Sequence, residues 1–422
     1  MLDIKFIREH PDLVKEGIRK KGDIDRVDEI LKLDVQRREL VGKGEALKSR
    51  RNVVSEEIGK AKRAGQDASQ AMSDMESVKS QIKSIDDELK GIGDSLNAAL
   101  LTVPNIPHPS VPEGKTPADN KEIAVWGENP VIDFKPKPHW ELVEKLGIID
   151  FERGVKITGA GFPVYKGQGA KMQRALINFF LDEGAMRGYQ EIQPPLMVNE
   201  ASARGTGQLP DKEDLMYTIP KDEFYMVPTA EVPVTNIHRD EIIPEAQLPI
   251  KYCAYTPCFR REAGSYGKDV RGLNRLHQFD KVELVKYVHP EKSYDELESL
   301  RGDAEQLLQK LGLRYHVLLM CSGDMGFTKA KKYDLEVWSM GQSRWLEVSS
   351  VSNFEAFQAR RMNIKFRPAG SGAKPEFVHT LNGSGLALPR VLAALLENYQ
   401  TPEGKIVVPK VLHKYTGFEV IG

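Results

Sequence analysis

Cysteine is scarce in this chain, which has Cys253, Cys258 and Cys321 among its 422 residues. Three cysteines fit neither a disulfide framework nor the paired spacing of a zinc site, so we expect a reduced, cytoplasmic setting and no zinc. No run approaches the roughly 18 apolar residues of a membrane span. The first residues, MLDIKFIREHPDLVKEG, are charged from the third position and lack the apolar core of a signal peptide.

An excess of charge of one sign is also missing, because 60 Lys and Arg residues balance 61 Asp and Glu residues. A net charge of -1 gives no overall indication of a nucleic-acid partner, so any basic surface must be local. The length exceeds that of one ordinary core, and about two to three domains are expected.

A long helical hairpin is predicted at about residues 27 to 100. From Met75 the apolar residues are spaced alternately by three and four, an unbroken heptad seam. An earlier segment has one apolar row at seven-residue spacing, and the turn-forming stretch GKAKRAGQDAS separates the two segments. Helices joined by a short turn lie antiparallel, each about 50 Å long at roughly 1.5 Å per residue. The seam residues are Met75, Val78, Ile82, Ile85, Leu89, Ile92, Leu96 and Ala99, and the earlier row is Leu33, Leu40, Leu47, Val54 and Ala61.

The first arm of this hairpin is rich in Lys and Arg, including Arg50, Arg51 and Lys60. Such charges form either a solvated coiled-coil surface or a phosphate-binding arm. Composition alone does not separate these interpretations.

A Pro-rich stretch, LLTVPNIPHPSVPEGKTP, follows the hairpin and cannot continue a helix. We therefore divide the chain into an N-terminal domain (1–103), a linker (104–125) and a second domain (126–422). The second domain mixes helices and strands without regular βαβ spacing, which predicts an α+β fold with a mostly antiparallel sheet flanked by helices.

Charged and aromatic residues alternate along the stretch from Thr256 to Leu284, which reads as two antiparallel strands joined by a Gly-rich basic loop. Alternate residues of a strand point to one face, so this pattern predicts either a polar, solvated face or a concave surface. Such a surface would bind phosphates, stack on a base and accept hydrogen bonds from amino groups. The aligned residues are Arg260 and Glu262 on the first strand, and Arg275, His277, Phe279, Lys281 and Glu283 on the second.

Three motifs in the expected order resemble those of the class II aminoacyl-tRNA synthetases. GYQEIQPPLM (188–197) resembles motif 1, FRRE (259–262) with RLHQF (275–279) resembles motif 2, and GLALPR (385–390) resembles motif 3. Within that class the whole chain is similar to seryl-tRNA synthetases. TAE (229–231), EVSS (347–350) and the N-terminal hairpin extend this resemblance.

The resemblance implies ATP-dependent activation of serine, followed by transfer of serine to the 3′ end of a tRNA. Joining two anions calls for positioning and charge neutralisation rather than a protein nucleophile. The implied catalytic residues are Arg260, Glu347 and Arg390. The implied ATP-binding residues are Arg260, Arg261, Glu262, Arg275, Phe279, Glu347, Val348, Ser349, Ser350 and Arg390, with Glu347 and Ser350 also holding Mg²⁺.

The serine site implied by the resemblance comprises Thr229, Ala230, Glu231, Arg260, Glu283, Asn382 and Ser384. Serine is small, so hydrogen bonds rather than volume must select it. From the residues alone, other interpretations stay open: Glu283 as the partner of Lys281 in an ion pair, Ser384 as a turn residue, and Thr229 as the end of a strand.

The implied partners are tRNA(Ser), bound through the hairpin at Arg50, Arg51 and Lys60, and a second copy of the chain, bound through the motif 1 helix and strand. Whether a selenocysteine tRNA is also charged stays open. Two alternatives are a ligase that loads a carrier protein, whose relatives lack the long hairpin, and an inactive RNA-binding paralogue, which would have lost Arg260, Glu283 or Arg390. All three residues are present.

Overall fold

A computed structural model describes residues 1–210, 214–262, 271–370 and 372–422. Most of the Gly-rich loop expected between the two strands of motif 2, residues 263–270, therefore lies outside the described residues. The chain divides into two compact units, Met1–Pro104 and Asn105–Gly422. No helix within the described ranges is long and apolar enough to cross a membrane.

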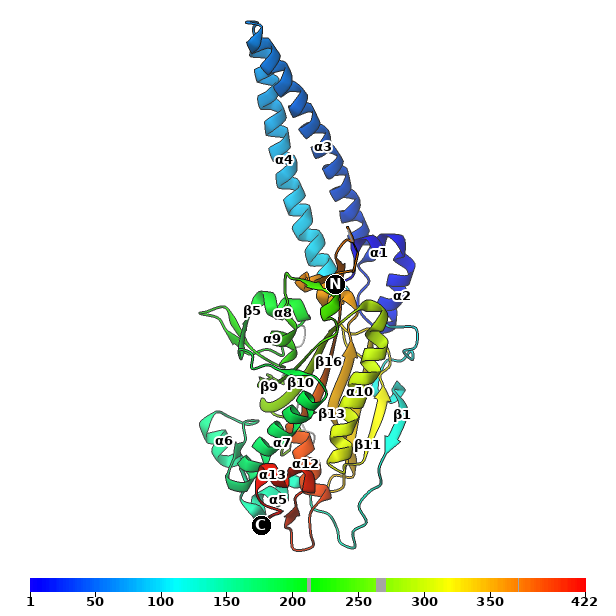
Figure 1. The fold of residues 1–422 in the computed structure, drawn as a ribbon, viewed down its shortest axis with the longest axis vertical. Coiled ribbons are helices and arrows are strands. Elements are labelled where there is room, and N and C mark those ends of the chain that lie inside the picture. Colours follow the sequence, from blue (N-terminus) through cyan, green and yellow to red (C-terminus); the bar gives the residue numbers. More distant parts are fainter. Residues whose placement is uncertain (211–213, 263–270, 371) are drawn as a thin grey trace. The chain divides into compact units, whose positions relative to one another are not determined.

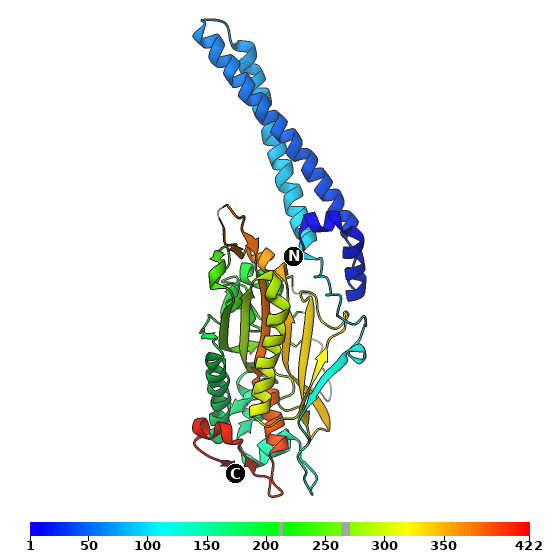
Figure 2. The ribbon, with the colours of Figure 1, turned by 45° about the vertical axis from the view of Figure 1, so that its right-hand side comes forward.

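The first unit consists of two short helices and a long antiparallel hairpin. Figure 2 shows the two long helices side by side, which confirms the predicted coiled-coil fold. Along the second helix the seam residues Val78, Ile82, Leu96 and Ala99 are buried, as heptad packing requires. The helices are α1 (Ile4–Glu9), α2 (Pro11–Lys21), α3 (Val27–Arg63) and α4 (Ser69–Leu101).

A buried carboxylate joins α1 to the base of the hairpin. Asp34 on α3 accepts hydrogen bonds from Arg8 (2.9 Å), Arg37 (2.9 Å) and Arg38 (3.1 Å), and its side chain is only 1% exposed. Burial alone would raise the pKa of Asp34, but the hydrogen bonds from Arg37 and Arg8 outweigh it and the pKa is lowered. The carboxylate therefore stays ionised between its guanidinium partners.

Residues 105–125 of the segment predicted as a linker belong to the second unit. Asn105 donates its backbone N–H to the carbonyl of Phe327 (3.0 Å), and His108 does the same to Ala330 (2.9 Å). Strand β1 (Lys121–Trp126) pairs antiparallel with β11 (Tyr315–Leu319). Prolines exclude a helix from this segment but still allow an extended strand at a sheet edge.

A sheet forms the centre of the second unit, and eight of its strands lie within the described ranges. Every neighbouring pair is antiparallel except β4 with β9, so the predicted α+β architecture is confirmed. In spatial order the strands are β1, β11, β12 (Lys331–Ser339), β13 (Arg344–Asn353), β16 (His379–Ala387), β10 (Gln278–Val288), β9 (Ile250–Phe259) and β4 (Gln190–Glu191).

Helices α7, α10 and α12 share one large apolar core with this sheet, and Figure 1 shows α10 lying along it. Along β10 the even-numbered Val282 and Leu284 belong to that core, whereas Val285 and Tyr287 belong to a second core with α9 and α11. The helices are α5 (His139–Leu146), α6 (Phe151–Ile157), α7 (Gly167–Met186), α8 (Glu200–Thr206), α9 (Glu231–Thr235), α10 (Ser293–Lys310), α11 (Ala356–Met362), α12 (Leu388–Asn398) and α13 (His413–Thr416).

Short strands complete the second unit. Strands β15, β14 and β8 form one group, which includes a parallel pair, and strands β5, β7 and β6 form an antiparallel group. The remaining short strands form two pairs, β2-β3 and β17-β18. Their bounds are β2 (Ile149–Asp150), β3 (Val164–Tyr165), β5 (Met197–Asn199), β6 (Thr218–Ile219), β7 (Phe224–Met226), β8 (Ile242–Pro244), β14 (Lys365–Arg367), β15 (Glu376–Phe377), β17 (Ile406–Val407) and β18 (Val420–Ile421).

We predict that Asp34→Asn loosens the base of the hairpin, because it removes the charge that three arginines share. A loss of about 2 kcal/mol is expected, because hydrogen bonds to a charged carboxylate are replaced by those to a neutral amide. Hydrogen exchange measured on residues 4–9 should then quicken by about thirtyfold. The control is Asp86→Asn, which removes an exposed pair with Lys48 (3.6 Å) and should change exchange little. Equal exchange rates in the two variants would contradict the assigned role of Asp34.

Candidate active site

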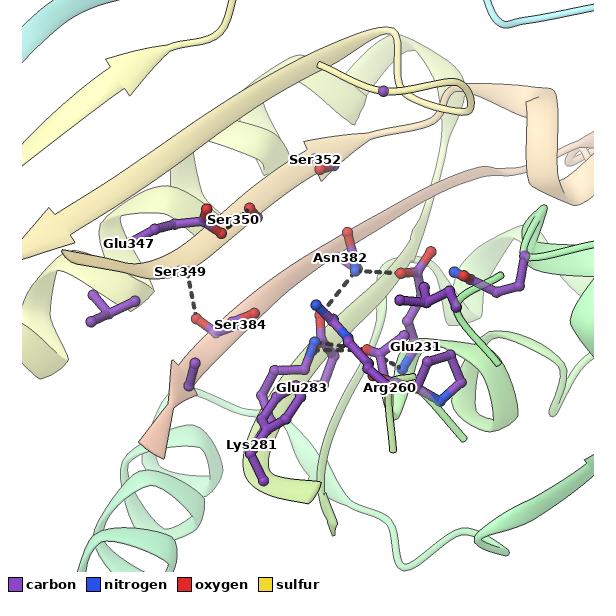
Figure 3. Close-up of a pocket in the computed structure, with 18 of the residues that line it drawn as sticks. Glu231, Arg260, Lys281, Glu283, Glu347, Ser349, Ser350, Ser352, Asn382 and Ser384 are labelled. Atoms are coloured by element: carbon purple, nitrogen blue, oxygen red, sulfur yellow. Dashed lines mark hydrogen bonds and ion pairs between the residues drawn. The ribbon is translucent and has the colours of Figure 1, made fainter. Parts of the chain in front are cut away.

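A cavity of about 470 Å³ opens on the sheet where β10, β13 and β16 meet the segment before α9. It is lined by residues from both halves of the sequence-predicted site, among them Thr229, Arg260, Glu283, Glu347 and Arg390. Figure 3 shows two groups of polar side chains in it, one around Glu231 and Glu283 and another around Glu347 and Ser350. We call these the serine half and the nucleotide half, after the roles expected from the sequence.

One amide holds two carboxylates together in the serine half. Asn382 Nδ2 donates to Glu231 Oε2 and to Glu283 Oε1, both at 2.9 Å. Glu231 begins α9, Glu283 lies on β10 and Asn382 lies on β16, so three separate elements converge here. All three side chains are largely buried, and Figure 3 shows them facing one another.

The hydroxyl of Thr229 connects Glu283 to a cation. Lys281 Nζ donates to Thr229 Oγ1 (2.8 Å), which itself donates to Glu283 Oε2 (3.3 Å). Lys281 also forms a direct ion pair with Glu283. The sequence-based alternative of an ion pair between these residues is therefore present, and it lies inside the cavity instead of on an outer strand face.

Glu231 is held by a further amide. Gln358 on α11 donates to Glu231 Oε1 (2.7 Å) and accepts from the hydroxyl of Thr380 (2.8 Å). Burial raises the pKa of Glu231, and the nearby carboxylate of Glu283 raises it further. The site thus presents carboxylate oxygens in an environment that favours a proton or a cationic partner.

Arg260 and the aromatic ring of motif 2 lie together. The Arg260 guanidinium lies over the Phe279 ring, 5.1 Å from its centroid, and Arg260 Nε donates to the carbonyl of Pro228 (3.2 Å). Phe279, Lys281 and Glu283 all line the cavity, as the alternating pattern predicted. Ser384 on β16 lines the same cavity and is the cross-strand partner of Glu283.

The predicted alternation fails before Gln278, where β10 begins. Arg275 lies in the preceding loop and lines the cavity in an ion pair with Glu262, 2.5 Å between Arg275 Nε and Glu262 Oε2. His277 is not among the lining residues: its Nδ1 contacts the hydroxyl of Tyr217 (3.0 Å) and its ring stacks on Phe162. The strand assignment was too long because alternation continued into residues 275–277, which precede β10, and the backbone of His277 bonds partly to Gly161, outside the motif 2 strands.

A β-bulge orders the nucleotide half. Glu347 and Ser350 lie three apart on β13, so a regular strand would point them to opposite faces. The pairing with β12 shifts register between Leu335 and Glu336, which places both side chains on the cavity side. Ser350 Oγ lies within hydrogen-bond distance of Glu347 Oε1 (3.2 Å) and Asp334 Oδ1 (2.5 Å).

Two carboxylates therefore share the hydroxyl of Ser350. Burial raises the pKa of Asp334 to about 6, and the neighbouring Glu347 adds to this shift. Burial acts on Glu347 in the same direction, but the cations Lys332 and Arg390 lower its pKa overall. Lys332 Nζ also pairs with Asp334 Oδ2 at 2.8 Å. These oxygen donors are of the kind that Mg²⁺ prefers.

Motif 3 contributes Arg390 from the first turn of α12. Its guanidinium donates from Nη1 to the carbonyl of Glu347 (2.9 Å) and from Nε to that of Asn274 (3.0 Å). Val348 and Ser349 also line the cavity, and Ser349 Oγ donates to the carbonyl of Ser384 (2.6 Å). Arg390 thus links the EVSS strand to the end of the motif 2 loop.

Two residues expected in the site are absent from the cavity lining. Ala230 is fully buried in the apolar core beside α11, and Arg261 points to Asp214, 3.2 Å away. Both are neighbours in sequence of lining residues, and they were predicted because they belong to the same motifs. Arg50, Arg51 and Lys60, proposed for tRNA, are exposed on α3 in the other unit.

Sequence reasoning missed several polar residues that line the cavity or form hydrogen bonds to its lining residues. Lys332 and Asp334 alternate with apolar residues along KKYDLEVW, and this period-two pattern could have placed them on the polar face. Gln358 gave no such signal, since it lies on a short helix outside the quoted motifs.

Comparison with known proteins agrees with this geometry. The family model of the tRNA synthetase class II core domain (G, H, P, S and T) matches residues 217–399, and that of the seryl-tRNA synthetase N-terminal domain matches residues 1–107. The serine–tRNA ligase of Salinibacter ruber is 57% identical and that of Desulforamulus reducens 59%, covering 100% and 99% of this chain and 99% and 98% of theirs. The structure of seryl-tRNA synthetase from Pyrococcus horikoshii complexed with ATP has a TM-score of 0.94 at 39% identity, covering 100% of this chain and 99% of that one.

The antiparallel sheet, its three motifs and the cavity lined by motifs 2 and 3 define a class II aminoacyl-tRNA synthetase core. The N-terminal hairpin and the full-length similarity then narrow the assignment. The chain belongs to the seryl-tRNA synthetase family, as the sequence motifs predicted.

We predict that Glu347→Gln lowers the pKa of Asp334, because removing a neighbouring negative charge makes ionisation easier. Burial remains, so a fall of about one unit is expected. The carboxyl ¹³C shift of labelled aspartate, titrated from pH 4 to pH 8, measures this change. Glu298→Gln, in a partly exposed pair with Arg301 on α10, serves as the control. An unchanged midpoint in Glu347→Gln would show that the two carboxylates are not coupled.

Proposed function

We propose that this chain activates L-serine with ATP to form seryl-adenylate and then transfers the seryl group to the 3′ end of tRNA(Ser). One observation carries the proposal: Glu231, Glu283 and Asn382 converge beside Arg260 and Thr229 in a single cavity. The names of the full-length relatives support the same reaction.

The serine half suits a small substrate with an ammonium and a hydroxyl. Glu231 and Glu283 offer carboxylate oxygens, while Thr229, Asn382 and Ser384 offer polar groups of either kind. An amino acid without the hydroxyl would leave some of these buried groups unpaired, which costs binding energy and gives selectivity. Glycine and alanine should therefore be rejected by hydrogen bonding instead of by size.

The reaction would proceed by attack of the serine carboxylate on the α-phosphorus of ATP, with pyrophosphate as the leaving group. Arg260 lines the cavity near the serine half, its charge also acts on Glu347 of the nucleotide half, and it would neutralise both anions at the reacting centre. Glu262 would accept from the adenine amino group and Phe279 would stack on the ring. Arg275 and Arg390 would hold the terminal phosphates. No protein nucleophile is needed, because the substrates supply both reacting groups.

Magnesium fits the nucleotide half. Glu347 and Ser350 would hold the ion, and the residues present agree with this, since oxygen atoms converge there. When bound, Mg²⁺ would neutralise phosphate charge. Asp334 adds a second carboxylate that the motifs did not indicate, and its ion pair with Lys332 keeps it in place.

We further infer that the hairpin of the first unit binds the tRNA, which assigns separate tasks to the N-terminal domain and the catalytic domain. Basic side chains including Arg50, Arg51 and Lys60 are exposed on α3, where they are able to reach phosphates. The carrier-protein alternative is less suited to a chain with this hairpin. Charging of a selenocysteine tRNA remains a question for experiment.

A homodimer through motif 1 is also proposed. A recess of about 560 Å³ lies over α7 and the segment around β4, lined by Ile177, Leu181 and Ile192 together with polar residues. A second copy of the chain would cover this apolar surface, which supports an association of the kind expected from motif 1. A cytoplasmic location likewise stays a prediction.

The test of the activation step is serine-dependent exchange between ATP and labelled pyrophosphate. The chain should exchange with serine and at most weakly with threonine, alanine or glycine. Glu283→Ala should lower the rate of exchange by about 10²-fold or more, while the affinity for ATP stays near that of the unaltered chain. Loss of ATP binding together with exchange would indicate a structural role for Glu283, and exchange supported equally by alanine would refute serine specificity.

A deletion tests the proposed task of the hairpin. Replacing residues 27–100 by a short linker should preserve serine-dependent exchange but abolish most aminoacylation, because the phosphate contacts are removed. Changing Arg50, Arg51 and Lys60 to Gln should raise the KM for tRNA and flatten its dependence on salt. Full charging by the deleted protein would show that the hairpin does not bind tRNA.

A further inference from the structure

A buried polar cluster lies behind the nucleotide half of the cavity, and the reaction described above does not use it. At its centre Glu397 on α12 accepts hydrogen bonds from five donors. These are the backbone N–H (2.9 Å) and Nδ1 (2.7 Å) of His139, Nε2 of Gln342 (2.9 Å), the N–H of Gly341 (3.1 Å) and the hydroxyl of Ser339. His139, Ser339 and Glu397 are completely buried.

The cluster contains an ionised carboxylate. Burial alone would raise the pKa of Glu397, but hydrogen bonds from His139 and Ser339 lower it overall. Five donors on two oxygens are more than a helix residue needs for packing, and each donor comes from the start of α5, the end of β12 or the turn after it. Glu397 therefore fixes the positions of these elements relative to α12.

The imidazole of His139 connects Glu397 to the backbone of the motif 2 segment. Its Nε2 accepts the backbone N–H of Leu273 at 2.8 Å. A peptide N–H can only donate, so Nε2 carries no proton and Nδ1 donates to Glu397. The hydrogen-bond partners thus set both the tautomer and the ring orientation. We call residues 271–276 the return arm, since they lead from the motif 2 loop into β10.

The return arm is fitted closely to this histidine. Gly272 has φ +67°, and a Cβ there would lie 2.2 Å from Nε2 of His139, so glycine is required on both counts. The guanidinium of the preceding Arg271 lies over the ring of Trp140, 4.9 Å from its centroid. Two consecutive residues of the arm therefore rest on the first two residues of α5.

The return arm in turn carries groups of the nucleotide half. The carbonyl of Asn274 accepts from Arg390 Nε (3.0 Å), the side-chain amide of Asn274 donates to Gln342 (2.9 Å), and Arg275 pairs with Glu262. A continuous chain of hydrogen bonds thus runs from Glu397 through His139 and the arm to Arg390. Arg390 and Glu397 are seven residues apart on α12, so they lie on the same face of that helix, two turns from each other.

We propose that His139, set by Glu397, is a positioning residue for the nucleotide: it holds the return arm so that Arg390 and Arg275 meet the phosphates of ATP. The inference rests on the proposed function for the identity of the ligand. The serine half is supported by other residues, Gln358 and Thr380, and should be insensitive to this cluster.

Two substitutions of His139 separate its hydrogen bonds. In His139→Asn the amide nitrogen can still donate to Glu397 but ends short of Leu273, leaving a buried N–H unsatisfied. In His139→Gln the longer side chain can place an oxygen where Nε2 was. Calorimetric titration with ATP and Mg²⁺ should show a Kd at least about tenfold weaker for His139→Asn, and within about threefold of the unaltered chain for His139→Gln. The KM for serine in pyrophosphate exchange should stay within about twofold in both.

Glycine substitutions give an independent comparison. Gly272→Ala should weaken ATP binding by a similar factor, because its Cβ meets the imidazole. Gly147→Ala is the matched control, since Gly147 has φ +64° and no atom within 4 Å of the added Cβ. Both carry the same backbone penalty, so only the contact with His139 distinguishes them.

The proposal is overturned if His139→Asn binds ATP normally, if the Asn and Gln variants weaken binding equally, or if the KM for serine rises in parallel. Equal ATP affinities for Gly272→Ala and Gly147→Ala would also overturn it. Thermal unfolding of each variant shows whether lost stability alone weakens ATP binding. The control is Tyr399→Phe, which removes a structural hydrogen bond at the end of α12. A chain that binds ATP but catalyses no exchange would refute the proposed function, while the ATP affinities would still decide this inference.

Discussion

The single side-chain amide of Asn382 holds two buried carboxylates, Glu231 and Glu283, at hydrogen-bond distance on either side of it. Like charges so close would repel, and the raised pKa of Glu231, caused by burial and then by Glu283, expresses that cost. Hydrogen bonds from the surrounding donors offset this repulsion. A bound ammonium group would reduce this repulsion, which supports the proposed binding of an amino acid here.

The sheet makes this concentration of charge compatible with folding. Because β10 alternates, Val282 and Leu284 pack into the helical layer while Lys281 and Glu283 turn into the cavity. The same strand therefore contributes to stability with one face and to chemistry with the other. In the nucleotide half, a β-bulge brings the side chains of Glu347 and Ser350 together on the cavity side.

Periodic patterns explain what the sequence could predict. The heptad seam indicated the hairpin, and the alternation on β10 indicated Phe279, Lys281 and Glu283, since each reflects a repeating geometry. The lack of regular βαβ spacing indicated the antiparallel sheet, and the resemblance to the synthetase motifs indicated most other site residues. Other features depend on tertiary contacts that no local pattern encodes. The pairing of β1 with β11 at the sheet edge, the place of His277 outside the cavity, and the approach of Gln358 and His139 from distant segments belong to this group.

The most direct measurement is a crystal structure of this chain with a non-hydrolysable analogue of seryl-adenylate. The account predicts the ammonium and hydroxyl of the seryl group within about 3 Å of oxygens among Glu231, Glu283 and their hydrogen-bond partners. It also predicts the guanidinium of Arg260 against the phosphate and the adenine over Phe279. An analogue bound with its seryl group away from both carboxylates, or bound outside this cavity, would contradict it.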